Sequence, residues 1–176
     1  VNSGRAIVEA IKNATDKPRV VIQASGINYY GLCGDQVLTE KDPTGAGNDF
    51  AAQVCVEWEA AKADVEAMGV RRAIIRTAPN LTKQGGILFY LAMPFKLFVG
   101  GPIGSGKQWF SWIHTVDQIR AIRFLIENEK TSGVYNVSAP DPRTNADFGK
   151  LIAQTLHRPY WFPVPGFVMR LIFGEL

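Results

Sequence analysis

One stretch decides the fold of this chain: Val20-Val21-Ile22-Gln23-Ala24-Ser25-Gly26-Ile27-Asn28-Tyr29-Tyr30-Gly31. Residues 19–24 form a short, mostly apolar run, which is typical of a parallel strand with both faces covered. Ser25 follows this run, and Gly26 begins a segment with turn-forming composition. We therefore expect a buried strand over residues 19–24, with Ser25 just past its carboxyl end.

Helical patterns lie on both sides of this strand. Ser3 precedes apolar residues at helical spacing, which predicts a capped amphipathic helix up to about residue 14. Residues 49–68 repeat the spacing, with Gly69 as a stop signal, and the run 73–77 predicts another strand. The helical positions there are Phe50, Val54, Trp58, Ala61 and Val65. Alternating strands and crossover helices predict an α/β fold with a Rossmann-like, doubly wound parallel sheet.

The second half continues this alternation. A helix is expected from Ile87 with a break near Pro94, and a capping box from Thr115 to Gln118 opens a helix over 116–129. The remaining elements expected are a strand over 133–138, a helix capped by Thr144 or Asn145 and ending near 156, and an amphipathic stretch after Gly166. In such sheets, ligands bind beyond the carboxyl ends of the strands, where Ser25 and Thr77 are expected.

Composition excludes several classes of protein. The 176 residues carry a formal charge of +3, with 47% hydrophobic and 20% charged residues. This composition is ordinary for a globular protein and gives no sign of a surface that binds nucleic acid or a membrane. Cys33 and Cys55 have no metal-ligand spacing, so reduced thiols are expected. We expect a soluble cytoplasmic protein with a small-molecule substrate and without a nucleic-acid, membrane or metal partner. The oligomeric state stays open, and a homo-oligomer is one candidate.

Residues 101–107 spell Gly-x-x-x-x-Gly-Lys, the pattern of a phosphate-binding loop. Gln108 stands where a phosphate-binding loop has a serine or threonine that binds magnesium. Pro102 has no backbone amide, so it removes one of the donors that would bind the phosphate. We therefore expect a loop over a substrate pocket, with Lys107 able to meet an anionic group. His114 and Asp117 are assigned structural roles, because Asp117 suits the first turn of a helix.

Several motifs occur together in one order. They are the opening stretch, Trp58-Glu59-Ala60-Ala61-Lys62, Arg76-Thr77, Gly100-Gly101-Pro102-Ile103-Gly104-Ser105-Gly106, Trp112-Ile113-His114, Tyr135-Asn136-Val137 and Pro163-Val164-Pro165. Over nearly the whole chain they resemble the atypical branch of extended short-chain dehydrogenases/reductases, the NAD-dependent epimerase/dehydratase-like family. The resemblance implies NAD or NADP as cofactor. It also implies oxidoreductase or epimerase/dehydratase-like action on a carbonyl or hydroxyl substrate, with a nucleotide sugar among the candidates.

The resemblance also implies roles for individual residues. Ser25 would hydrogen-bond a substrate oxygen, and Lys62 would hold the nicotinamide ribose. Because Tyr29 and Tyr30 adjoin Ser25, either phenol is a candidate proton donor in place of the family's tyrosine, and the alternative is that Tyr30 lines the substrate pocket. The implied cofactor contacts are Ala24, Ser25, Lys62, Thr77, Ala78, Pro79 and Asn80, and the implied substrate contacts are Tyr29, Tyr30, Trp58, Lys107 and Trp112. Trp58 occupies the tyrosine's position, and an indole does not titrate usefully.

Alternatives remain at each position. Ser25 can be a turn residue, Lys62 can pair with Glu59 or Glu66 on a solvated face, and Trp58 can pack in the core. The expected division is a C-terminal half of a cofactor domain over 1–84 and a substrate-binding portion over 85–176, with 112–138 returning to the sheet. The glycine fingerprint of the cofactor site is absent, so we expect a piece of a protein of about twice the size. The competing function is a non-catalytic dinucleotide-binding or interaction protein that has lost the tyrosine.

Overall fold

The computed structural model describes residues 2–47 and 49–163. The chain forms two compact units: unit 1 holds residues 1–78 and 116–138, and unit 2 holds residues 79–115 and the chain from 139 onward. Each unit is described by itself. The division into a cofactor portion over 1–84 and a substrate portion over 85–176 stays a prediction about function.

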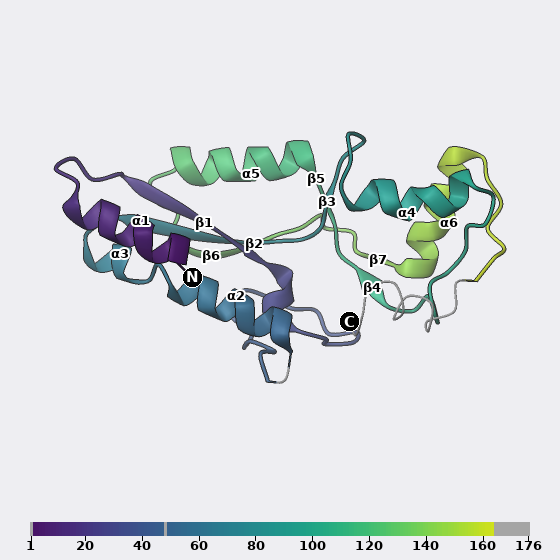
Figure 1. Ribbon diagram of the computed structural model, residues 1–176, viewed down its shortest axis with the longest axis horizontal. Coiled ribbons are helices and arrows are strands. Elements are labelled where there is room, and N and C mark those ends of the chain that lie inside the picture. The colour runs from purple at the N-terminus through teal and green to yellow at the C-terminus, as the bar shows by residue number, and fades with distance from the viewer. Residues whose placement is uncertain (1, 48, 164–176) are drawn as a thin grey trace. The chain divides into compact units, whose positions relative to one another are not determined.

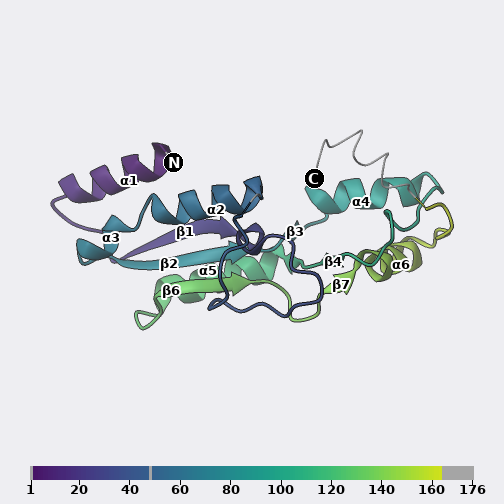
Figure 2. The same cartoon turned by 90° about the horizontal axis from the view of Figure 1, so that it is seen from below.

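Unit 1 is built on a three-stranded parallel sheet. Its strands are β1 (Val20–Gly26), β2 (Arg71–Thr77) and β6 (Gly133–Val137), in the order β1-β2-β6. Figure 2 shows the three strands side by side with β2 in the middle. The middle strand is almost wholly buried, as an apolar run covered on both faces requires. The expected α/β fold with a parallel sheet is confirmed.

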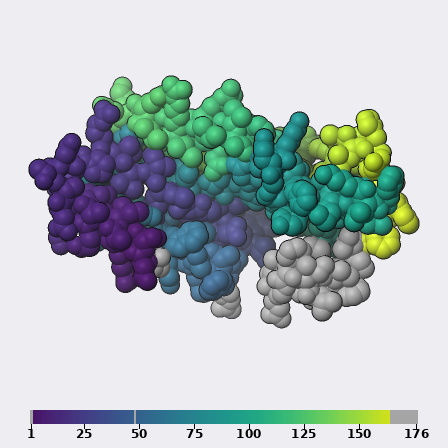
Figure 3. Space-filling view, turned by 45° about the horizontal axis from the view of Figure 1, so that its top comes forward, coloured from purple at the N-terminus to yellow at the C-terminus, as the bar shows by residue number. Residues whose placement is uncertain are grey.

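Helices cover both faces of this sheet. They are α1 (Asn2–Asn13), α2 (Phe50–Ala60), α3 (Asp64–Ala67) and α5 (Thr115–Glu127). Figure 1 shows α5 on one face and α2 with α3 on the other. Beneath α1 and α3 lies a buried apolar cluster of Val8, Ile11, Val65 and Val70. α5, the green surface in Figure 3, exposes four large apolar side chains, Val116, Ile119, Phe124 and Ile126, so its apolar residues are not confined to one buried stripe.

Three boundaries in unit 1 differ from expectation. The single helix expected over 49–68 is wrong, because residues 61–63 form a turn between α2 and α3. The face of α2 is also different: Ala52, Cys55 and Glu59 are buried, whereas Trp58 is 46% exposed. Ser25 lies within β1 instead of after it, and Ser3 lies inside α1, so Ser3 is not that helix's N-cap.

The long connection after Gly31 is fastened to unit 1 by hydrogen bonds. The Tyr29 carbonyl accepts from the Gly45 amide at 3.0 Å and from the Thr44 hydroxyl at 2.9 Å. Farther along, the Glu40 carboxylate accepts from the Asn136 amide of β6 at 2.8 Å. Residues 31–47 are therefore tied to the carboxyl end of the sheet at two separate places.

The described residues of unit 2 form two helices and two short strand pairs. The helices are α4 (Ile87–Lys96) and α6 (Asn145–Leu156). The pairs are β3 (Asn80–Leu81) with β5 (Ile113–His114), which are parallel, and β4 (Trp109–Phe110) with β7 (Arg143–Thr144), which are antiparallel. Phe95 of α4 packs against Ile152 and Ala153 of α6. This cluster joins the two helices.

The break expected at Pro94 is wrong, because α4 continues through it to Lys96. Proline removes one amide donor, but the backbone bonds resume at once. The Leu97 amide donates to the Met93 carbonyl at 3.1 Å, and the Val99 amide donates to the Pro94 carbonyl at 2.9 Å. Among the described residues, no helix is long and apolar enough to cross a membrane. The amphipathic stretch expected after Gly166 lies outside the described residues.

The expected cap of α6 is confirmed. The Thr144 hydroxyl accepts from the Asp147 amide at 3.2 Å and donates to the Asp147 carboxylate at 2.8 Å. This bond, and after it the bond from Lys150, lowers the pKa of the Asp147 carboxyl below its ordinary value. A lowered carboxyl pKa stabilises the fold above the pKa of the unfolded chain, and the contribution is lost as pH falls through the folded pKa.

We expect Thr144→Val to raise the pKa of Asp147 toward its ordinary value, because valine cannot donate to the carboxylate. A carbon NMR titration of the Asp147 carboxyl measures this change. Thr155→Val, an exposed substitution on the same helix, serves as control and leaves the pKa where it is. An unchanged Asp147 pKa in Thr144→Val contradicts the assignment.

Candidate functional site

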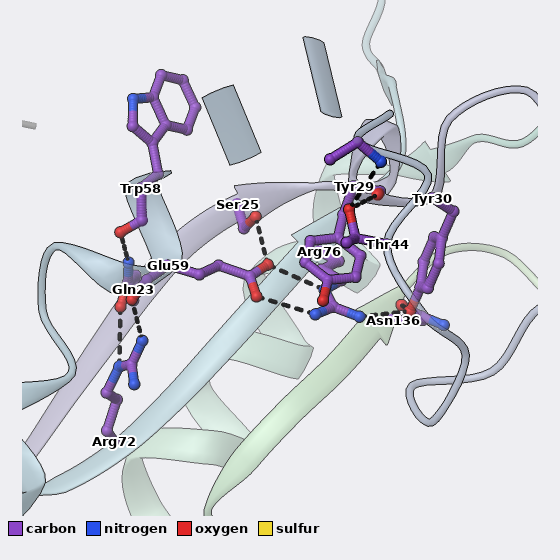
Figure 4. A network of polar contacts seen from close by, with 11 residues as sticks. Gln23, Ser25, Tyr29, Tyr30, Thr44, Trp58, Glu59, Arg72, Arg76 and Asn136 are labelled. Carbon is purple, nitrogen blue, oxygen red and sulfur yellow. Dashed lines mark hydrogen bonds and ion pairs between the residues drawn. The ribbon is translucent and has the colours of Figure 1, made fainter. Parts of the chain in front are cut away.

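The carboxyl ends of the strands in unit 1 bring several polar side chains together. Ser25 of β1 lies opposite Arg76 of β2, and Arg76 lies opposite Asn136 of β6. Because parallel strands end at the same edge of a sheet, side chains far apart in sequence meet there. Figure 4 shows these residues with Glu59, which reaches them from α2.

Ser25 is bound to Glu59. Its hydroxyl donates to Glu59 Oε1 at 2.7 Å, and both residues are buried. A hydroxyl has one proton, so in this arrangement Ser25 offers any further group only its lone pairs. The expected donation from Ser25 to a substrate oxygen requires the hydroxyl to turn away from Glu59. That role stays a prediction.

Glu59 and Arg76 form a two-point ion pair. Arg76 Nε donates to Glu59 Oε1 and Arg76 Nη2 donates to Glu59 Oε2, both at 2.9 Å. Arg76 is only 3% exposed. Burial alone lowers the pKa of its guanidinium, but hydrogen bonds to Glu59 and to the Tyr30 hydroxyl outweigh burial and raise that pKa above its ordinary value. The Arg76 guanidinium therefore stays charged and binds both oxygens of the Glu59 side chain.

Two tyrosines enclose Arg76. The Tyr30 hydroxyl accepts from Arg76 Nη1 at 2.9 Å and donates to Asn136 Oδ1 at 2.7 Å. Tyr29 covers the guanidinium with its ring, whose centroid lies 3.3 Å from the Arg76 Cζ. The Tyr30 proton is committed to Asn136 and its side chain is buried, so this geometry disfavours Tyr30 both as a proton donor and as a substrate contact. Tyr29 is half-buried and keeps its predicted role open.

A second group of contacts holds the end of α2 to the sheet. Gln23 Nε2 donates to the backbone carbonyl of Trp58. Arg72 Nε donates to Gln23 Oε1 at 2.9 Å, and Arg72 Nη2 donates to the backbone carbonyl of Glu59. Arg72 Nη1 also lies 3.6 Å from the Glu66 carboxylate of α3. Arg72 therefore bridges α2 and α3.

The structure tests the purely structural roles considered for Lys62 and Trp58, which were an ion pair for Lys62 and packing in the core for Trp58. Within the described residues, Lys62 pairs with neither Glu59 nor Glu66, whose carboxylates bind Arg76 and Arg72 instead. Lys62 is half-buried on the turn after α2. Trp58 does not pack in the core, because nearly half of it is exposed. Both alternatives are thus wrong, while no hydrogen bond or ion pair of the described residues joins Lys62 to Ser25.

The other predicted cofactor contacts follow β1 and β2. Ala24 is exposed beside Ser25, and Thr77 ends β2. Ala78 is buried, and its amide donates to a β6 carbonyl at 3.0 Å. The Pro79 carbonyl accepts from the β5 amide at 3.0 Å, and Asn80 Oδ1 accepts from the hydroxyl at the start of α5 at 2.5 Å. The Ala78 amide and this Asn80 oxygen therefore have partners within the protein.

Two predicted substrate contacts belong to unit 2. Lys107 is exposed, and the Trp112 indole donates to the Asp141 carbonyl at 3.1 Å. The loop over residues 101–107 leads into a strand, β4, and not into a helix, so a phosphate-binding loop is excluded. This loop packs on the start of α6, where the Ile103 amide donates to Asn145 Oδ1 at 2.9 Å.

Sequence reasoning missed five members of the site, which are Gln23, Glu59, Arg72, Arg76 and Asn136. The available signal was the strand Arg71-Arg72-Ala73-Ile74-Ile75-Arg76-Thr77, which carries arginines within an apolar run. A buried arginine requires an acceptor or a carboxylate nearby, so such a strand predicts an acidic partner on the covering helix. No group of three His, Cys, Asp or Glu residues suited to a metal occurs in the described part of the chain.

Known proteins share this fold. A human structure described as epimerase family protein SDR39U1 (isoform 2) with NADPH is 31% identical, with a TM-score of 0.90. The match covers 99% of this chain and 58% of that one. A nucleoside-diphosphate sugar epimerase from Corynebacterium glutamicum is 33% identical, with a TM-score of 0.77, over 98% of this chain and 38% of that one.

Sequence comparison agrees with the structural one. Epimerase family protein YfhF of Bacillus subtilis (strain 168) is 38% identical over all 176 residues, and the chain spans 57% of that protein's length. The model of the NAD-dependent epimerase/dehydratase family matches residues 1–138, which include β1, β2, β6 and every member of the Ser25–Glu59–Arg76 network. The chain therefore belongs to the NAD-dependent epimerase/dehydratase family.

Proposed function

We propose that this chain is part of an NAD(P)-dependent oxidoreductase or epimerase/dehydratase-like protein that acts on a carbonyl or hydroxyl substrate. The observation that carries the proposal is the buried Ser25–Glu59–Arg76 network at the carboxyl end of a parallel sheet. Fixed polar groups at this edge are what hydride chemistry on an oxygenated carbon needs. The NADPH in the structure of the human relative supports the cofactor class, and the description of the bacterial relative as a nucleoside-diphosphate sugar epimerase supports the substrate class.

The residues present fit the nicotinamide half of such a cofactor. Lys62 would hold the nicotinamide ribose, because the neighbouring carboxylates leave its ammonium unpaired among the described residues. Thr77 at the end of β2 would border the ring. When bound, the nicotinamide supplies a hydride donor or acceptor. NAD and NADP are both compatible with these contacts.

The protein's own residues then have distinct tasks. While Glu59 holds the Ser25 side chain through its 2.7 Å hydrogen bond, Ser25 would accept from a substrate hydroxyl. It would donate to a substrate carbonyl only after its hydroxyl turns away from Glu59. Arg76 holds the Glu59 side chain in place through two hydrogen bonds, and Tyr30 fixes the far end of Arg76. The exposed indole of Trp58 would form part of the substrate surface.

We expect Ser25→Ala to lower kcat/KM for reduction or oxidation of the substrate by about 100-fold, the loss typical of one preorganised polar contact. The full-length protein is screened on carbonyl compounds and nucleotide sugars by the absorbance of reduced nicotinamide. NADPH affinity, measured by fluorescence, should fall far less than kcat/KM, because Lys62 is intact. Ser132→Ala, an exposed serine in unit 1, is the matched control and keeps full activity. Full activity in Ser25→Ala would overturn the assignment.

A second function is favoured by one observation: position 58 is a tryptophan, so the side chain one turn before Lys62 cannot exchange a proton. On this alternative the protein binds a dinucleotide and partners without catalysis. Tightly bound cofactor together with no turnover on the whole panel, and no effect of Ser25→Ala, would favour the alternative over the enzyme.

A further inference from the structure

The backbone ladder of α2 stops at the carbonyl of Trp58. In a continuous helix each carbonyl accepts from the amide four residues later, so the Trp58 carbonyl would accept from Lys62. Here it accepts from Gln23 Nε2 instead. No backbone hydrogen bond of the described residues joins the Lys62 amide to Trp58. A side chain of β1 therefore takes the place that belongs to Lys62 in a helix.

The next carbonyl is diverted in the same way. In an unbroken helix the Glu59 carbonyl would accept from the Ala63 amide. It accepts from Arg72 Nη2, and the Ala63 amide turns to the Ala60 carbonyl at 3.1 Å, three residues back. This closer bond is the tight turn that separates α2 from α3. Two side chains of the sheet network thus take two consecutive carbonyls and interrupt one helix.

Burial makes this interruption obligatory. Gln23 is 0% exposed and Arg72 is 7% exposed, so their donors must find partners inside the protein. Gln23 Oε1 already accepts from Arg72 Nε at 2.9 Å, which directs the Gln23 amide nitrogen toward α2. The helix carbonyls satisfy both donors. The break is therefore set by the sheet and not by the residues of the turn, which are Ala61, Lys62 and Ala63.

The turn is also fixed from its outer side. α1 passes close to it at Gly4, where an added Cβ would lie 3.0 Å from the Ala61 Cβ and 3.6 Å from the Lys62 Cγ. The stem of Lys62 is thus held between α1 and the end of α2. Four-residue spacing would place Lys62 above Trp58 on one helical face, but the turn removes that relation.

We infer that Gln23 and Arg72 are positioning residues for Lys62: by taking the Trp58 and Glu59 carbonyls they set where its ammonium lies. The inference rests on the proposed role of Lys62 in holding the nicotinamide ribose. Gln23 and Arg72 touch neither substrate nor cofactor in this role. They act only through the backbone of residues 58–63.

The test is Gln23→Glu in the full-length protein. Glutamate keeps the size and the acceptor for Arg72 but has no proton for the Trp58 carbonyl. We expect the Lys62 amide to take that carbonyl, so its hydrogen exchange, read by NMR, slows at least tenfold. We also expect NADPH to bind about tenfold more weakly, approaching the affinity of Lys62→Ala, since a hydrogen bond to a charged group is displaced. Gln23→Leu, which also lacks the donor, repeats both measurements and replaces Gln23→Glu if that variant does not fold.

Gln53→Glu is the matched control, because Gln53 is an exposed glutamine of the same helix that donates to the Gly47 carbonyl at 2.8 Å. It leaves both readouts unchanged. Equal Lys62 exchange in wild type and in both Gln23 variants overturns the inference. If exchange slows but NADPH affinity is unchanged, while Lys62→Ala weakens binding, Gln23 interrupts the helix but does not position Lys62, and the inference is overturned. If the wild-type protein binds no NADPH, the proposed function fails, and the exchange data decide only whether Gln23 interrupts the helix.

Discussion

Arg76→Met is expected to lower the free energy of unfolding by about 3–5 kcal/mol, because it leaves the buried Glu59 carboxylate without its cation. Methionine fills much of the arginine's volume but supplies none of the donors that bind Glu59 and the Tyr30 hydroxyl. Glu59 would then keep only its bond from Ser25 and would lie buried without a cation, which is the costly way to break such a pair. Urea unfolding of the full-length protein, followed by the tryptophan signal and by circular dichroism, measures the loss.

Two variants show whether the loss comes from the pair. Arg123→Met breaks an exposed ion pair with Glu127, whose side chains are 74% and 60% exposed, and should leave stability unchanged. The double variant Arg76→Met/Glu59→Leu removes both charges and should recover part of the loss, since no uncompensated carboxylate remains. A single variant Arg76→Met as stable as wild type would show that Glu59 does not depend on this arginine.

Phe95→Ala is expected to destabilise unit 2 by about 3–5 kcal/mol, the usual cost of removing a buried aromatic ring. Phe95 is 4% exposed and lies at the contact between α4 and α6, against Ile152 and Ala153. Its ring also stacks on Tyr160, with centroids 6.3 Å apart and planes 14° from parallel. Because the protein has two units, amide hydrogen exchange in α6 is a cleaner measure than a single melting temperature.

The control for this substitution lies on the same helix. Phe89 is 46% exposed, so Phe89→Ala removes little buried surface and should leave exchange in α6 unchanged. Equal protection of α6 in Phe95→Ala and Phe89→Ala would mean that this cluster does not hold the two helices together.

The strands of unit 1 could be predicted because their apolar runs are local. Residues 19–24, 73–77 and 133–138 were expected, and β1, β2 and β6 follow them within one or two residues. α6 was predictable for the same reason, since the Thr144 cap lies at its own start. The local sequence pattern is sufficient to predict an element whose position is defined by its own residues.

The break in the helix over 49–68 could not be read in this way. It depends on Gln23 and Arg72, which lie 35 residues before Trp58 and 13 residues after Glu59. The buried face of α2 failed for a related reason. Hydropathy favours burying Trp58. The ion pair with Arg76 instead turns Glu59 toward the sheet, and Trp58, as the neighbouring residue, then points to a different face of α2.

Ser25 was identified from its position at the end of an apolar run, and its partners were not. The residues that hold it come from α2 and β2, so their meeting is a tertiary event. Tyr30 shows the same limit: its proximity to Ser25 in sequence suggested chemistry, whereas the fold commits its hydroxyl to Asn136. Only the arginines of β2 carried a sequence signal for the network.

The discontinuous course of unit 1 sets the order in which a newly made chain can complete it. Tyr30 and its acceptor Asn136 are 106 residues apart, and much of unit 2 is made between them. At ordinary rates of synthesis the interval is roughly 5–20 s. From the completion of β2 until β6 is made, the ribosome-bound chain has no β6 to pair with β2, so one side of β2 is an open strand edge. Closure of the sheet is then a late, long-range step in biogenesis, and the nascent chain is most exposed to chaperones and to aggregation before it.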